Sequence, residues 1–498
     1  MTLFLRALVL SLLASLAGLS LAACRAGGGA YVEPTLETHG VILDGDVSEW
    51  PSDVAAFADE HYLYLRFTIE GEQFSLQAAP SNVTIHIDAD ASAATGRSEA
   101  GGPLGGMGID AEVEFSPRRA DGNAGRGVAV WRVESNGSRT RVPTEAVDFA
   151  IAPTHSSSWY EMRISRTPSV PLYPDGPGLA TTGTARAVVT VRGPDGRMAA
   201  WSDPASATIE DVCAGGRRLS SLPPPAPPAR GLRVISWNIE LSAPMKNPEP
   251  FTRILRALHP DVLLLQEWEE GDASAVAAWL DRAGFPGWNV HKPEGDMRVG
   301  GGVLVASRFP LEGIDQTLRA RSGDRETTVR VAAAVAKTPL GDLLAASLHL
   351  KCCGFKDSPE DRQRMSEARA INAMLADAAS SRGARLRVVG GDVNLVGSRP
   401  PLDLLRAGLD ADGSDLAIAD ARVLGDRTYT TWRDWSTSFP PGRLDFIVYS
   451  DSALASNSFV FDTARLTPAV LDPLGVQRDD SAASDHLPVV VDLAPTRR

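Results

Sequence analysis

A proline-rich segment, RLSSLPPPAPPAR at residues 218–230, divides this sequence into two parts. Most of its positions lack an amide proton or precede a proline, so it can form neither a helix nor a central strand. We therefore expect an extended linker between two separately folded domains, residues 31–217 and 231–498. The length of 498 residues agrees, because it is about three times that of a typical domain of ~150 residues.

Residues 1–23 have the layout of a secretory signal peptide. Arg6 is the single charged side chain before a long apolar stretch. The stretch ends in LAAC, which resembles the lipobox of bacterial lipoproteins. The resemblance implies cleavage before Cys24, acylation of its thiol and an extracytoplasmic, lipid-anchored protein of the cell envelope. Arg25 favours the outer membrane, and residues 24–30 would be the flexible lipidated tether. An uncleaved anchor helix and a plain cleaved signal are the alternatives.

Overall composition excludes several classes of protein. Hydrophobic residues make up 43% and charged residues 22%, which argues against disorder and against a polytopic membrane protein. The net charge of 49 − 62 = −13 argues against a broad electrostatic grip on nucleic acid, although a local basic groove is compatible with it.

The four cysteines lack the paired spacing of a zinc site, so any metal ion should have oxygen ligands. Besides Cys24 they are Cys213, Cys352 and Cys353. An oxidising envelope would allow Cys213 to pair with Cys352 or Cys353.

Residues 31–217 contain short alternating runs separated by Gly, Pro and Asp. Tyr62–Ile69, Val83–Ile87 and Ala187–Val191 are examples, and this spacing predicts an all-β sandwich. The segment LDGDVSEW at residues 43–50 gives the domain a loose resemblance to carbohydrate-binding and DOMON-type sandwich modules. The resemblance implies a glycan or another envelope component as its ligand.

Three aspartates of this domain have the chemistry of a calcium site. Asp88, Asp90 and Asp110 would offer carboxylate ligands from loops. Turn aspartates that accept hydrogen bonds from their own backbone are the alternative, and we assign no site there.

Residues 231–498 interleave buried apolar runs with a helical pattern. Met365, Ala368, Ile371 and Leu375 recur at a helical period, which predicts a helix over Glu360–Ala379. Mixed strands and helices predict a layered α/β architecture. The apolar runs are Val262–Leu265, Gly302–Ala306, Leu343–Leu350, Leu386–Val389, Phe446–Tyr449 and Leu487–Leu493.

Polar side chains stand at the ends of six apolar runs. A single Asn or Asp at such a position usually caps a turn, and a single His is usually structural. Six such positions in one domain indicate that these side chains lie together along one edge of it. The residues are Asn238, Gln266 with Glu267, His349, Asp392 with Asn394, Asp445, and Asp485 with His486.

The segments that carry these residues resemble, in order, the motifs of the endonuclease/exonuclease/phosphatase superfamily of divalent-metal phosphoesterases. The resemblance covers nearly all of residues 231–493 and implies a four-layer α/β/β/α sandwich. Val393 departs from the pattern, since the family usually has Phe there. The matching segments are SWNI (236–239), LQE (265–267), GVLVASRFP (302–310), SLHL (347–350), GDVN (391–394), RLDFI (443–447) and SDHLP (484–488).

The resemblance also implies a metal site and its cofactor. Glu267 would be the principal ligand of Mg²⁺, or of Mn²⁺, with Asn238 beside it and Asp485 completing the acidic pocket. An oxygen-rich site suits these ions better than zinc.

Five further residues receive catalytic roles from the resemblance. Asp392 would orient or deprotonate the attacking water, and Asn394 would hold that water or a phosphate oxygen. His486, oriented by Asp445, would contact the scissile phosphate. His349 would stabilise a non-bridging oxygen or assist the leaving group.

The implied activity is hydrolysis of a phosphodiester, with nucleic acid as the first candidate substrate. Phospholipase C-like action on a headgroup such as that of sphingomyelin, and a sugar- or inositol-phosphate phosphatase, are alternatives. A different class would be a non-catalytic lipoprotein that binds a glycan or a partner, which the intact set of Glu267, Asp392 and His486 argues against. All of these residues follow the linker. We therefore expect the first domain to hold the enzyme near its substrate and to take no part in catalysis.

Overall fold

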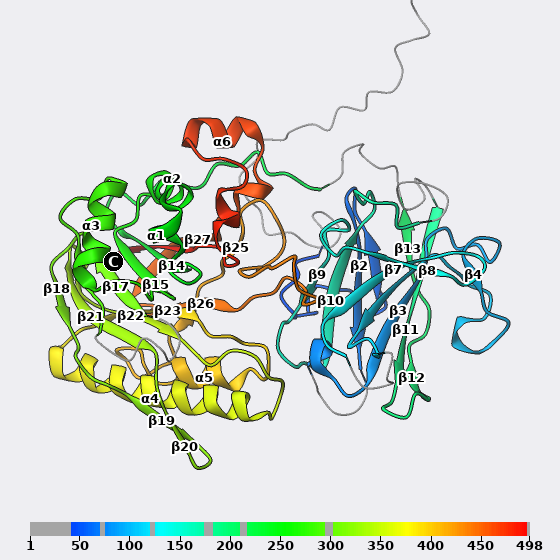
Figure 1. Ribbon diagram of the computed structural model, residues 1–498, viewed down its shortest axis with the longest axis horizontal. Coiled ribbons are helices and arrows are strands. Elements are labelled where there is room, and N and C mark those ends of the chain that lie inside the picture. The colour runs from blue at the N-terminus through cyan, green and yellow to red at the C-terminus, as the bar shows by residue number, and fades with distance from the viewer. Residues whose placement is uncertain are drawn as a thin grey trace, which may run out of the picture.

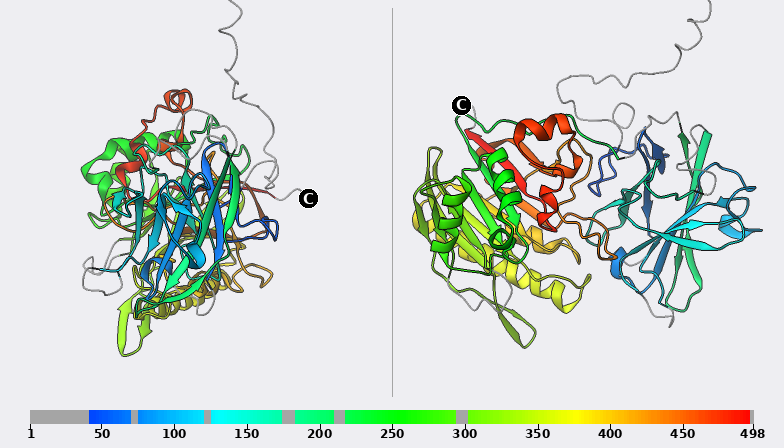
Figure 2. Two further views of the ribbon diagram at one scale, coloured as in Figure 1. Left: turned by 90° about the vertical axis from the view of Figure 1, so that its right-hand side faces the viewer. Right: turned by 45° about the horizontal axis from the view of Figure 1, so that its top comes forward.

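The structure, a computed structural model, describes six parts of the chain: residues 41–69, 75–119, 125–173, 183–209, 217–293 and 302–495. Within them an all-β region and an α/β region lie side by side (Figure 1; Figure 2, right). The predicted signal peptide, the tether with Cys24, and Cys213 lie outside the described residues. No helix in the described parts is long and apolar enough to cross a membrane.

The all-β region is a sandwich of two antiparallel sheets. One sheet has the order β1-β2-β10-β9, and the other has the order β12-β11-β3-β6-β7-β8, with β13 also paired to β11. The strands are β1 Ala56–Ala58, β2 Tyr62–Thr68, β3 Asn82–Asp88, β6 Ala111–Phe115, β7 Val128–Val133, β8 Arg139–Val142, β9 Ala150–Ala152, β10 Trp159–Ser165, β11 Gly183–Arg192, β12 Met198–Trp201 and β13 Ala205–Ile209. A small hairpin joins β4 Arg97–Ser98 to β5 Gly108–Ile109.

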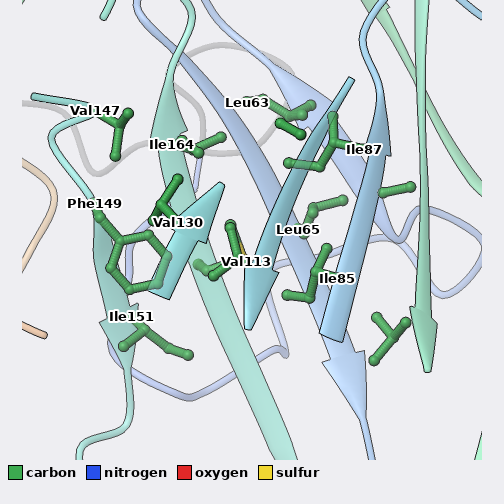
Figure 3. Close-up of a cluster of buried hydrophobic side chains, with 14 of the residues drawn as sticks. Leu63, Leu65, Ile85, Ile87, Val113, Val130, Val147, Phe149, Ile151 and Ile164 are labelled. Carbon is green, nitrogen blue, oxygen red and sulfur yellow. The ribbon is translucent and has the colours of Figure 1, made fainter. Parts of the chain in front are cut away.

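Alternate side chains of these strands fill the space between the two sheets. Leu63 and Leu65 of β2 meet Ile85 and Ile87 of β3 in this core (Figure 3). The period of two is that of a strand with one face toward the core. The predicted β-sandwich is thus present.

The aspartates considered as a calcium site bond to nearby backbone. Asp90 Oδ1 accepts from Ser92 N, Asp88 Oδ2 from Gly108 N and Asp110 Oδ2 from Ala89 N. The bond to Asp90 is that of the turn alternative, whereas the bonds to Asp88 and Asp110 join residues about 20 positions apart. The three carboxylates lie close enough together to hold a cation.

The α/β region contains two mixed sheets packed face to face. The first has the order β16-β17-β15-β14-β28-β27-β25, and the second has the order β18-β21-β22-β23-β26-β24. The strands are β14 Leu232–Asn238, β15 Val262–Gln266, β16 Asn289–His291, β17 Leu304–Ser307, β18 Leu311–Gly313, β21 Val331–Thr338, β22 Gly341–His349, β23 Leu386–Asp392, β24 Ala417–Ile418, β25 Arg422–Val423, β26 Asp445–Tyr449, β27 Ala453–Val460 and β28 Val489–Pro495. A separate hairpin pairs β19 Arg319–Ser322 with β20 Arg325–Thr328.

Helices cover the outer face of each sheet and complete four layers. The apolar faces of α2 and α3 pack on β14 and β15, and those of α4 and α5 pack on β22 and β23. Val234, Leu264 and Val388 belong to the core between the sheets. The predicted α/β/β/α sandwich is confirmed. The helices are α1 Ala243–Lys246, α2 Pro248–Leu258, α3 Ala273–Ala283, α4 Pro359–Arg382, α5 Pro400–Arg406 and α6 Pro468–Leu474.

Helix α4, the long yellow helix of Figure 1, contains the helix predicted over Glu360–Ala379 and extends it at both ends. The side chain of Ser358 accepts a hydrogen bond from Asp361 N at the start, and Gly383 ends the helix with a φ of 65°. Helices α2 and α3 were not predicted.

The proline-rich linker is extended, as predicted, but it is attached to the α/β region. Ser220 N donates to Arg465 O at 2.7 Å, and Ser220 O accepts from Thr467 N at 2.9 Å. Arg233 Nη2 donates to Pro225 O at 2.8 Å. The linker therefore follows a defined path across the surface.

Candidate active site

The predicted site residues gather at one edge of the two central sheets. Strands β14 and β15 are parallel, as are β22 and β23, so their carboxyl ends meet at the same edge. In register, His349 lies opposite Asp392, and Asp392 lies opposite Asp445 on antiparallel β26. The structure thus brings together residues that are up to 248 positions apart, from Asn238 to His486.

His486 and Asp445 form a hydrogen-bonded pair at the centre of the site. His486 Nδ1 lies 2.8 Å from Asp445 Oδ2, and its Nε2 lies 3.7 Å from Asp392 Oδ2. Burial alone would lower the pKa of His486, but the carboxylates of Asp445 and Asp392 outweigh it and raise the pKa to about 10. Trp237 Nε1 donates to the His486 carbonyl at 2.9 Å and holds its backbone. His486 is therefore a fixed imidazolium at neutral pH.

Asp392 and Asn394 form a second unit beside it. Asn394 donates to Asp392 twice, from its backbone N and from Nδ2, each at 2.9 Å. Burial raises the pKa of Asp392, and the nearby Asp445 and Glu267 carboxylates add to the rise. This carboxylate is suited to accept a proton.

His349 is held in the neutral state. Arg330 Nη1 lies 3.2 Å from His349 Nδ1, and since a guanidinium can only donate, Nδ1 must be the acceptor. Burial and the charge of Arg330 hold the pKa of His349 well below its ordinary value. The ring proton is therefore on Nε2, which lies 3.4 Å from Asp392 Oδ2 and 3.9 Å from Glu267 Oε1.

The predicted metal ligands Asn238 and Glu267 are in direct contact. Asn238 Nδ2 donates to Glu267 Oε1 at 3.0 Å, and Leu241 N donates to Glu267 Oε2 at 3.1 Å. Asp485 accepts from Trp432 Nε1 at 2.9 Å. Burial raises the pKa of Asp485, and the charge of Glu267 contributes to this rise.

The charge balance of the site fits a divalent cation. Five carboxylates converge on this edge, and burial together with their mutual repulsion raises the pKa of several of them. The imidazolium of His486 supplies one compensating charge, so the oxygen-rich set favours a hard cation. The carboxylates are Glu240, Glu267, Asp392, Asp445 and Asp485.

The tightest potential ligand group here differs from the predicted one. In the described parts of the chain, the ligand atoms of Asp392, Asp445 and His486 lie within 4.8 Å of one another, whereas Glu267 and Asp485 belong to no such group. Asp445 Oδ1 is buried and has no hydrogen-bond partner among the described residues.

Three residues of this site were missed by sequence reasoning. Trp432 binds Asp485, Arg330 fixes His349, and Thr431 Oγ1 accepts from both Leu444 N and Asp445 N. Thr431 and Trp432 lie away from any long apolar run. Arg330 directly precedes the apolar run at residues 331–336, so its position carried the same signal as that of Asp445.

Solved structures of other proteins share limited similarity with about half of this chain. An endonuclease/exonuclease/phosphatase from Bacteroides vulgatus is 16% identical, with 53% of this chain and 99% of that chain covered and a TM-score of 0.37. The 3′ phosphatase NExo from Neisseria, bound to product DNA hairpin, is 18% identical, with 53% and 99% covered and a TM-score of 0.37. Beta toxin from Staphylococcus aureus is 15% identical, with 52% and 99% covered and a TM-score of 0.35.

No curated protein matches the chain. The model of the Endonuclease/Exonuclease/phosphatase family matches residues 235–486, which is half of the chain and includes every residue described above as part of the site. From this match and the four-layer fold, the chain belongs to the endonuclease/exonuclease/phosphatase family.

Proposed function

We propose that this protein is an extracytoplasmic, divalent-metal-dependent phosphoesterase that hydrolyses phosphodiester bonds, with nucleic acid as the first candidate substrate. Membership of the family supports a hydrolase activity. The observation that carries the proposal is the convergence of a charged histidine, a neutral histidine and a proton-accepting carboxylate at the edge that Glu267 and Asn238 share.

Each group suits one requirement of phosphate-ester hydrolysis. The raised pKa of Asp392 fits it to take a proton from an attacking water, which Asn394 beside it helps to orient. His486, as an imidazolium, would donate to a phosphoryl oxygen, and His349 would donate from Nε2 to a second oxygen or to the leaving group. Glu267 and Asn238, with Asp485 beside them, would hold the divalent cation, which would supply positive charge to neutralise the phosphoryl group.

The substrate class is tested by turnover of plasmid DNA, RNA, sphingomyelin, an inositol phosphate and a small synthetic phosphodiester. Each is incubated with Mg²⁺ and with EDTA. Preferred cleavage of DNA or RNA supports the nuclease proposal. Preferred cleavage of sphingomyelin or of the inositol phosphate assigns the phospholipase C-like or phosphatase alternative. No turnover of any substrate by folded protein favours a non-catalytic binding protein.

Turnover is expected to require a divalent cation, because the carboxylates of the site need compensating charge. EDTA should abolish it, and added Mg²⁺ or Mn²⁺ should restore it. Glu267→Gln removes one ligand charge, so it should raise the Mg²⁺ concentration needed for half-maximal rate. Glu270→Gln is the matched control, since Glu270 is exposed and pairs with Lys246 at 3.7 Å. Full activity in EDTA, or equal Mg²⁺ requirements for both variants, would contradict the assignment.

The proposed lipid anchor predicts a change of compartment for one substitution. Cys24→Ala should release the protein from the membrane fraction, because acyl chains supply about 0.8 kcal/mol of anchoring per buried CH₂. Fractionation after a high-salt wash measures this, with Cys353→Ala as the control that removes a different thiol. If the Cys24 variant still sediments with membranes, the lipobox assignment is wrong or the sandwich binds an envelope component.

A further inference from the structure

The two regions of the chain are joined by a buried contact that the sequence did not predict. The outer face of the sheet β1-β2-β10-β9 contacts the α/β region, and its fully buried Tyr62 accepts from Arg465 Nη1 at 3.4 Å. Arg163 on β10 binds Asp426 with two hydrogen bonds, and Arg465 binds Asp148 in the same way. These ion pairs fix the sandwich on the α/β region.

Loops of the sandwich reach the two segments that carry candidate catalytic residues. Ser75 Oγ donates to Val396 O at 2.9 Å, and Ser156 N donates to Gly397 O at 2.8 Å. The two acceptors lie two and three residues after Asn394. Thr154 Oγ1 accepts from Arg443 N at 2.9 Å, two residues before Asp445.

The contact at Thr154 is tight and directional. A Cβ added to Gly442 would lie 2.7 Å from Thr154 Oγ1, so only glycine allows this approach. The Arg443 guanidinium lies over the rings of Tyr429 and Phe446, each at 4.5 Å, and these contacts also hold the residue in place.

Three consecutive backbone N–H groups at the start of β26 are bound by two threonine hydroxyls. Thr154 Oγ1 accepts from Arg443 N. Thr431 Oγ1 accepts from Leu444 N at 2.9 Å and from Asp445 N at 3.0 Å. The carbonyl of Leu444 in turn accepts from Val393 N at 3.0 Å, between Asp392 and Asn394. A shift of the Arg443 backbone would therefore move both the segment that carries Asp445 and the segment that carries Asp392 and Asn394.

We propose that Thr154 of the N-terminal sandwich is a positioning residue for the active site, which acts by holding the Arg443–Asp445 backbone and hence the orientation of His486. The inference rests on the proposed phosphoesterase function. It makes the sandwich a structural part of the catalytic unit, whereas the sequence assigned it only a locating role.

The test compares Thr154→Val with Thr154→Ser in the full chain, because valine keeps the size and loses the hydroxyl. Thr154→Val should lower kcat roughly 5- to 50-fold, since the half-buried Arg443 N–H loses its acceptor and the reacting groups shift. KM should stay within about twofold, and Thr154→Ser should restore kcat to within about twofold of the unsubstituted protein. Thr140→Val, on the exposed edge strand β8, is the control and should change neither value.

A double-mutant cycle separates positioning from general destabilisation. In the Asp445→Asn background, Thr154→Val should lower kcat by less than about twofold, because the group it positions is already impaired. An unchanged kcat in Thr154→Val, failure of serine to rescue it, or losses that multiply in the double variant would overturn the proposal.

Hydrogen exchange tests the inference independently of activity. The amides of residues 442–446 should exchange faster in Thr154→Val than in Thr140→Val, with exchange elsewhere unchanged. If the unsubstituted protein hydrolyses none of the substrates, the proposed function fails. Unchanged exchange of residues 442–446 in Thr154→Val would show separately that Thr154 does not hold this backbone segment.

Discussion

His486→Ala is expected to lower turnover of a phosphodiester by roughly 10²- to 10⁴-fold, the usual contribution of a positioned acid–base group. The ring is buried, its Nδ1 is 2.8 Å from Asp445, and two carboxylates raise its pKa to about 10, so the variant loses the positive charge that the proposed function places beside the reacting phosphate. Steady-state kinetics with Mg²⁺ measures the loss, and circular dichroism confirms that the variant is folded.

The same experiment includes two comparisons. His259→Asn removes an exposed histidine that adopts a left-handed conformation after α2, and it should leave turnover unchanged. Asp445→Asn should act through His486, so the double variant should be little worse than His486→Ala alone. Losses that multiply independently would contradict the pairing of these two residues.

The strands of both regions could be predicted because burial imposes a pattern on them. A strand between two packed sheets reads as a continuous apolar run, as in Val262–Leu265, which lies within β15. Helix α4 was visible from its regular spacing of apolar residues. Helices α2 and α3 were missed although the buried residues of each recur at a helical period, as Phe251, Ile254 and Leu258 do in α2. Each has 11 residues, less than half the length of α4, so the pattern is repeated over only about two to three turns.

The site was predictable only to the extent that its residues end apolar strands. Asn238, His349 and Asp392 do so, and the parallel pairing of their strands then brings them to one edge. Arg330 and Trp432 occupy loops whose sequence does not indicate what they contact. Their roles depend on tertiary contacts between segments far apart in the chain, which no local pattern encodes.

The alternating sequence of β2 predicts a strand with one face in a core and the other in solvent, but both of its faces are buried. Leu63 and Leu65 fill the sandwich. On the opposite face Tyr62 and Tyr64 pack in a cluster with Trp50, and Tyr62 Oη accepts from Arg465 Nη1 of the α/β region at 3.4 Å. An interface of this kind combines aromatic and charged side chains, so it has the sequence pattern of a solvent-exposed face. The linker therefore led us to expect two independent domains. The tyrosines and arginine of this sheet face in fact belong to the contact between the two regions.

Asp426→Ala is expected to lower the free energy of unfolding by about 3–5 kcal/mol, because it leaves a buried charge without its main partner. The side chain of Arg163 is 1% exposed, and Asp426 receives both of its hydrogen bonds. Asp195→Ala is the matched control: Asp195 pairs with Arg197 at 3.7 Å with both side chains exposed, so its loss should cost less than about 1 kcal/mol. Urea unfolding at pH 7 measures both variants. Equal small losses would mean that the Arg163–Asp426 pair does not hold the two regions together.

The pH dependence of this effect has a definite sign. Burial alone would raise the pKa of Asp426, but Arg163 and Arg465 outweigh it and hold the pKa well below its ordinary value. The folded protein therefore binds fewer protons than the unfolded chain, so this group stabilises the fold above the unfolded pKa of about 3.9 and loses that contribution as the pH falls. Asp426→Asn does not titrate, so the difference in unfolding free energy between the unsubstituted protein and this variant should shrink by about 1 kcal/mol from pH 7 to pH 3. A difference that stays constant over this range would show that Asp426 titrates alike in the folded and unfolded chain, and that its pairing with the two arginines contributes nothing to the docking of the sandwich on the catalytic region.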